Sequence, residues 1–239
     1  MTTFLVIHGA WGAGWAWKKM RPLLGKRGHE LFTPTQTGIG ERSHLAGPDV
    51  DLDLHIADNL AVLEFEDLRD VVLVGHSYGG MVATGVADRA ADRIAQLVYL
   101  DAFVPRNGQA VIDLIGETAR GNVVATVRSE GEGWKVPANP MPPDTSQADL
   151  AWAVPRRVAQ PQKTFLQPLR LDGAVDRLPR AYIYCTRPGP GDVFRQFADR
   201  ARSEPGWACH ELDASHNPHI TMPETLAALF DVIATRRSV

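Results

Sequence analysis

Residues 71–80 constrain the fold more than any other part of the chain. The segment opens with the apolar run Val-Val-Leu-Val, which lacks polar alternation and is typical of a strand covered on both faces. A helical pattern follows it from about Gly79 to Ala91. A covered strand that turns directly into a helix indicates an α/β fold, with a mostly parallel sheet flanked by helices.

Other strand and helix signals repeat this alternation. Ile56, Leu60 and Leu63 share one face of a predicted helix, and a last helix is expected from about Pro223. Further strands are predicted at residues 4–8, 30–33, 97–100, 181–185 and 208–212, and further helices at about 15–26 and 193–202.

The pattern changes between residues 104 and 178. Eight prolines break this stretch into short pieces without a sustained strand, which indicates an insertion and not an independent unit. We therefore predict one domain over residues 1–239, with a core of residues 1–104 and 179–239 and an inserted cap of about 105–178.

Ser77 is the candidate nucleophile. It occupies the centre of Gly75-His76-Ser77-Tyr78-Gly79, a G-x-S-x-G motif placed between the strand and the helix. Side chains two residues either side of the serine would collide in so sharp a turn, and Gly75 and Gly79 remove that collision. Ser77 Oγ is then expected to project at the carboxyl edge of the sheet, next to the positive end of a helix dipole.

A serine hydroxyl needs a base at neutral pH, and His216 is the leading candidate. It lies in a loop after the last predicted strand and before the last helix, which brings it to the same edge as Ser77. His219, three residues further on, is its rival.

Two carboxylates compete for the third position, which orients the imidazole. Asp101 directly follows the strand at 97–100, where an unpaired buried carboxylate would be costly. Asp192 precedes the helix at 193–202 and could simply be its N-cap. The residues favour Asp101 and leave Asp192 open.

Two backbone N–H groups should stabilise an oxyanion. The residue after the nucleophile, Tyr78, is expected to supply one. The turn at residues 8–10 should supply the other, through Ala10.

Several segments resemble one branch of the α/β-hydrolase superfamily. They are His8-Gly9-Ala10-Trp11, the pair Trp15 and Trp17, Pro22-Leu23-Leu24 and Gly28-His29. The branch contains plant methylesterases, hydroxynitrile lyases and bacterial small-molecule esterases. The resemblance covers nearly the whole chain except the cap. It implies the α/β-hydrolase fold, a serine–histidine–acid mechanism, a small helical cap over a mostly apolar pocket, and no cofactor.

The chain departs from this branch at the acid. Most members carry it shortly after the strand equivalent to residues 181–185, where this chain has Arg187-Pro188-Gly189 and a displaced Asp192. Many haloalkane dehalogenases carry it after the preceding strand, where Asp101 stands. Their nucleophile is an aspartate, so the serine at position 77 disfavours that activity here.

The expected activity is therefore a serine hydrolase acting through an acyl-enzyme on Ser77. Apolar cap residues and the tryptophans favour small, mostly apolar carboxylic esters, with carbamates, amides or lactones also open. The alternatives are a C–C lyase of the hydroxynitrile type, disfavoured because no lysine stands near Asp192 or His216, and a non-catalytic small-ligand receptor.

Composition excludes several other classes. The net charge of −3 gives no basic field for nucleic acid, and no apolar run approaches the roughly 20 residues of a membrane span. Cys185 and Cys209 are too few for a disulfide framework or a metal site and are expected to be reduced, buried thiols. We expect a cytoplasmic monomer or homodimer that binds a small-molecule substrate and no metal.

Overall fold

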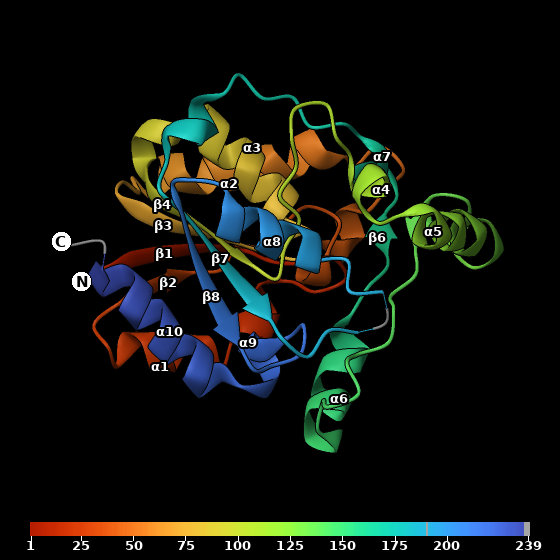
Figure 1. The fold of residues 1–239 in the computed structure, drawn as a ribbon. Coiled ribbons are helices and arrows are strands. Elements are labelled where there is room, and N and C mark those ends of the chain that lie inside the picture. The colour runs from red at the N-terminus through yellow and green to blue at the C-terminus, as the bar shows by residue number, and fades with distance from the viewer. Residues whose placement is uncertain (190, 237–239) are drawn as a thin grey trace.

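The computed structural model describes residues 1–189 and 191–236 and is built on a six-stranded sheet (Figure 1). The strand order is β2-β1-β3-β4-β7-β8, and every neighbouring pair runs parallel. The predicted parallel sheet is therefore confirmed. The strands are β1 (Thr3–Ile7), β2 (Glu30–Phe32), β3 (Val71–His76), β4 (Ile94–Leu100), β7 (Arg180–Cys185) and β8 (Trp207–Leu212).

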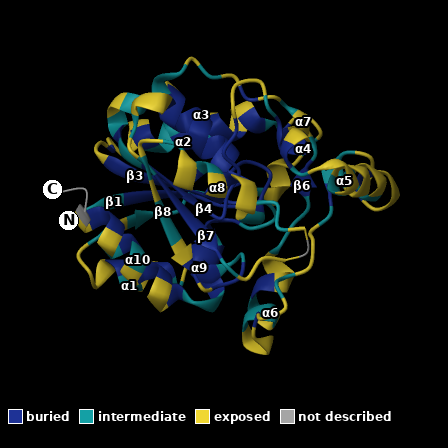
Figure 2. Cartoon of the chain, viewed as in Figure 1, coloured by how far each residue is buried: buried dark blue, intermediate teal, exposed yellow. Residues whose placement is uncertain are grey.

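Helices cover both faces of the sheet, as Figure 1 shows. One face packs against α2 (Leu52–Phe65), α3 (Gly79–Arg89) and α8 (Arg195–Ser203), and the other against α1 (Met20–Gly25) and α10 (Pro223–Arg236). Each face has its own hydrophobic cluster, so all six residues of β3 are buried (Figure 2). An apolar run without polar alternation is stable only in such a position.

The helix expected over residues 15–26 is wrong in its first half. A 3₁₀ helix (Gly14–Trp17) comes first, and α1 begins only at Met20. Pro22 explains the break, because proline has no N–H to donate and fits only in the first turn of a helix. Starting at Met20 places Pro22 within that turn.

The segment between β4 and β7 consists of short elements, and α5 and α6 stand out from the body of the molecule (Figure 1). It adds no strand to the main sheet. Its elements are α4 (Val111–Leu114), α5 (Glu117–Ser129), α6 (Gln147–Ala153), α7 (Lys163–Leu166) and the antiparallel pair β5 (Lys135–Val136) and β6 (Gln160–Pro161).

Both cysteines carry free thiols, Cys185 in a buried position and Cys209 in a half-buried one. Among the described residues, no helix has the length and apolar character needed to cross a membrane. The same part of the chain contains no group of three or more histidine, cysteine, aspartate or glutamate side chains suited to hold a metal ion.

Candidate active site at the carboxyl edge of the sheet

Ser77 sits in a strained turn between β3 and α3. Its φ is 54°, in the left-handed region that non-glycine residues rarely adopt. A Cβ on residue 75 would lie 2.8 Å from the carbonyl oxygen of Gly79, and one on residue 79 would lie 2.2 Å from the carbonyl oxygen of Ile7. Both glycines are therefore required by the turn itself, as the motif predicts.

The turn after β1 packs directly against this elbow. A Cβ added to Gly9 would meet the Ser77 Cβ at 2.9 Å, so the two backbones approach more closely than a side chain permits. Ser77 is 8% exposed. The predicted source of the second oxyanion donor, the turn at residues 8–10, is thus held beside the nucleophile.

His216 and Asp101 meet at the same edge. Nδ1 of His216 lies 2.7 Å from Oδ2 of Asp101, and the acid is 4% exposed. The other carboxylate oxygen of Asp101 accepts the N–H of Cys185 at 3.3 Å. A carboxylate can only accept, so His216 donates from Nδ1 and keeps its lone pair on Nε2, the nitrogen that a base must present to a serine.

Backbone contacts hold Ser77 close to this pair. The N–H of Ser77 donates to the carbonyl of Leu100 at 3.3 Å, the residue before Asp101. The imidazole Nε2 of His76, the residue before Ser77, lies 2.8 Å from the carbonyl oxygen of His216. The structure thus joins His216 to Asp101 and places the backbone of Ser77 and the ring of His76 beside this pair.

Asp192, the alternative acid, is engaged elsewhere. Its Oδ2 accepts from the hydroxyl of Tyr184 at 2.8 Å and from Nε of Arg195 at 2.7 Å. The expected N-cap role is wrong, because α8 begins at Arg195 and its cap position is Phe194. The carboxylate instead bonds to the side chains of Tyr184 and Arg195.

His219 is buried and stacks on Trp17, with ring centroids 4.5 Å apart and planes at 11°. Desolvation lowers the pKa of His219 to about 3. Burial also lowers the pKa of His76 well below its usual value. These two histidines therefore stay neutral beside His216, and among the described residues Nδ1 of His219 has no hydrogen-bond partner, whereas His216 pairs with Asp101.

The two proposed oxyanion donors keep their amides available. Within the described part of the chain, the N–H groups of Ala10 and Tyr78 donate to no protein acceptor. The Tyr78 hydroxyl instead lies 2.9 Å from Nδ1 of His55, which fixes the side chain away from the site. The ring centroid of Phe165 lies 5.7 Å from that of Tyr78 and 6.1 Å from that of Trp11, so these three rings form one aromatic group.

Sequence reasoning missed two rings that contact the base. Phe194 stacks on His216 at 4.9 Å with an interplanar angle of 8°, and His76 lies at 4.8 Å with its plane tilted by 36°. The position of His76 next to Ser77 was a signal for the second contact. Nothing local in the sequence marks Phe194.

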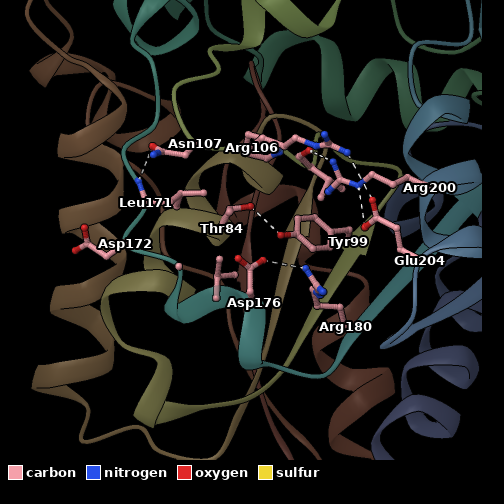
Figure 3. A pocket seen from close by; sticks show the side chains of 14 residues that line it. Thr84, Tyr99, Arg106, Asn107, Leu171, Asp172, Asp176, Arg180, Arg200 and Glu204 are labelled. Atoms are coloured by element: carbon pink, nitrogen blue, oxygen red, sulfur yellow. Dashed lines mark hydrogen bonds and ion pairs between the residues drawn. The ribbon is translucent and has the colours of Figure 1, made fainter.

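A small cavity of about 40 Å³ adjoins the site, lined among others by Ala10, Trp15 and Trp17. A larger one of about 450 Å³ lies elsewhere, against Arg180 at the start of β7 (Figure 3). Figure 3 shows its polar character, with Arg106 and Arg200 both paired to Glu204. None of the residues named for catalysis lines this larger cavity.

The comparison with protein families decides the affiliation of the chain. A model described as the alpha/beta hydrolase family matches residues 4–229. The chain belongs to this family. The resemblance to the branch with plant methylesterases and hydroxynitrile lyases is also confirmed, since such proteins of Arabidopsis thaliana match shorter stretches of this hydrolase.

Two curated relatives and one solved structure match this hydrolase over most of its length. A carbendazim hydrolyzing esterase of Nocardioides sp. (strain SG-4G) is 39% identical over 238 residues, which cover 95% of this chain and 97% of that protein. A pyrethroid hydrolase of Sphingobium wenxiniae is 29% identical over 95% of this chain and 85% of its own. An extracellular alpha/beta-hydrolase from a Paenibacillus species superposes with a TM-score of 0.83 at 25% identity, covering 96% of this chain and 98% of its own.

Proposed function

We propose that Ser77 is the nucleophile of this hydrolase, with His216 as its base and Asp101 as the acid that orients the base. The amides of Ala10 and Tyr78 are proposed as the oxyanion hole. The observation that carries this assignment is the 2.7 Å contact between His216 Nδ1 and Asp101 Oδ2, which leaves Nε2 for a serine held at the same sheet edge.

The protein is a hydrolase of ester or carbamate bonds, as its similarity to an esterase and a pyrethroid hydrolase supports. Within this class we assign small, mostly apolar substrates. The small cavity at Ala10 is lined in part by Trp15 and Trp17, and the net charge of −3 offers no attraction for a polyanion.

In the proposed reaction, His216 Nε2 takes the hydroxyl proton of Ser77 as the oxygen attacks the substrate carbonyl carbon. The two amides stabilise the negative oxygen of the tetrahedral intermediate. The intermediate collapses, and the leaving group departs with the proton from the imidazolium. Water, deprotonated by His216, then attacks the acyl carbon and releases the acid and free Ser77.

Labelling with a fluorophosphonate probe, followed by peptide mass spectrometry, tests the nucleophile. We expect one phosphonylated residue, Ser77, and a loss of turnover of p-nitrophenyl acetate by about 10⁴-fold or more in Ser77→Ala. Ser43→Ala, at an exposed serine, is the matched control and should keep its activity. Labelling at another residue, or near-normal turnover by Ser77→Ala, would refute the proposal.

A substrate panel tests the bond type and size. Aryl esters and aryl N-alkyl carbamates of increasing acyl length should be hydrolysed with kcat/KM falling at long chains. A preference for charged or long-chain substrates would contradict the proposed substrate class while leaving the role of Ser77 intact.

A further inference from the structure

The hydrogen bond that His216 Nδ1 donates to Asp101 holds only one edge of the imidazole. A single contact at Nδ1 fixes the position of that nitrogen but leaves the plane of the ring free to pivot. Such a pivot would move Nε2 away from Ser77. The side chain of His216 is 27% exposed, so close packing by the surrounding protein does not by itself prevent this motion.

The ring of Phe194 supplies a constraint on the plane of the imidazole, to which the His76 ring lies tilted by 36°. The centroid of the Phe194 ring lies 4.9 Å from that of His216, and the two planes are within 8° of parallel. Stacked rings at this separation attract each other beyond the burial of their area. Parallel contact also opposes rotation of the imidazole out of its plane, which the hydrogen bond to Asp101 does not.

We propose that Phe194 is a positioning residue that holds the plane of the His216 imidazole and stabilises its protonated form during catalysis. This inference rests on the proposed function, because it requires His216 to act as the base. Phe194 touches no reacting atom in this role and acts only through His216.

The position of Phe194 is itself well determined. Its ring packs edge-on against Phe103, with centroids 5.1 Å apart and planes at 61°. Its carbonyl accepts the N–H of Ala198 at 3.3 Å in the first turn of α8. A ring tied to a helix and to a neighbouring aromatic can restrain the imidazole at little further entropic cost.

The electrostatic surroundings of His216 give the stacked ring a second effect. An aromatic face attracts a cation by about 0.5–1 kcal/mol at partly exposed sites, and His216 becomes a cation when it takes the Ser77 proton. The groups that face or neighbour it are the Asp101 carboxylate, the neutral His76 and His219, and the Asp192–Arg195 ion pair beside Phe194.

The test replaces Phe194 by leucine, which fills a comparable volume without an aromatic face. We expect kcat to fall about threefold to tenfold. The acidic limb of the kcat/KM profile should move to lower pH by about half a unit, because the imidazolium loses its stacked partner. Phe194→Tyr keeps the ring and should bring the limb back to the wild-type position.

Phe197→Leu is the matched control on the same helix. Phe197 is buried, contacts Phe103 at 6.0 Å, and has no ring contact with His216 among the described residues. This variant should lower the midpoint of thermal unfolding and leave the acidic limb in place. A purely structural role of Phe194 would give Phe194→Leu the same signature.

Two results would therefore overturn the inference. One is Phe194→Leu with an unshifted acidic limb, and the other is a shift to higher pH. Fluorophosphonate labelling of the wild-type enzyme separates this failure from that of the proposed function. If Ser77 is labelled normally while the limb stays in place, only the role of Phe194 is refuted; if Ser77 is not labelled, the triad assignment fails first.

Discussion

Asp101 and His216 are 115 residues apart in the chain, and their side chains meet at 2.7 Å. The contact depends on an unusual backbone conformation, since φ of Asp101 is 42°. Aspartate tolerates this left-handed region better than most residues. The N–H of Asp101 donates to the carbonyl of Ile183 at 2.8 Å. The backbone of Asp101 therefore stays bonded to β7 while its side chain reaches His216.

Exchange of each candidate acid for its amide separates the two carboxylates. Asp101→Asn should lower kcat by about 10³–10⁴-fold, because the amide favours the wrong imidazole tautomer and cannot stabilise the imidazolium. Asp192→Asn should change kcat by a few-fold at most, since its partners are Tyr184 and Arg195. Kinetics with p-nitrophenyl acetate measure kcat of each variant, and circular dichroism checks that its fold is unchanged. The opposite ranking would assign the acid to Asp192.

Gly79→Ala should destabilise the protein by about 1–3 kcal/mol through overpacking. The added methyl group would lie 2.2 Å from the carbonyl oxygen of Ile7, and neither backbone can move without disturbing the sheet. Gly121→Ala is the matched control, because nothing lies within 4 Å of the added Cβ on the exposed face of α5. It should gain about 0.5–1 kcal/mol. Urea unfolding compares the two, and equal stabilities would contradict the close approach at Gly79.

Stability should decline as the pH falls below 6.5. Burial lowers the pKa of His8 and His55 to about 4 and that of His219 to about 3. These side chains are neutral in the folded protein, whereas the unfolded chain takes up their protons near pH 6.5. Each such histidine removes up to about 1.4 kcal/mol per pH unit between 6.5 and its folded value.

Urea unfolding at pH 7.5, 6.5 and 5.5 measures this slope. His55→Gln should reduce the loss between pH 6.5 and 5.5, because one proton-binding difference is removed. His44→Gln, at an exposed histidine, should leave the slope unchanged. A wild-type stability that is constant over this window would show that the buried histidines are not held neutral.

Asp88→Ala should cost about 2–4 kcal/mol of unfolding free energy. The buried carboxylate of Asp88 accepts the backbone N–H groups of Asp172, Gly173 and Val175 at 2.6, 3.0 and 3.0 Å. Its removal leaves three backbone donors, that of Val175 buried, without this acceptor. Asp92→Ala is the control, since Asp92 is 75% exposed and pairs with Arg69 at 3.6 Å; its effect should stay within about 0.5 kcal/mol. Thermal and urea unfolding of both variants test the difference.

Much of the fold followed from local patterns. The run at β3 and the glycines around Ser77 predicted a covered strand, a sharp turn and a helix, and all three are present. The predicted helix over residues 15–26 was too long, because the apolar pattern continues across Pro22. The missing N–H of Pro22 restricts where a helix can begin, and α1 begins at Met20. Spacing alone did not reveal that constraint.

The sequence by itself determined the elbow at Ser77 and the edge at which His216 lies, because sterics over a few residues and the parallel direction of the strands leave little choice. Only the tertiary structure decided which carboxylate meets His216 and that Phe194 stacks on it. Both contacts join segments far apart in the chain. Their geometry depends on backbone conformations and loop packing that emerge when the whole sheet is assembled, and no local propensity encodes them.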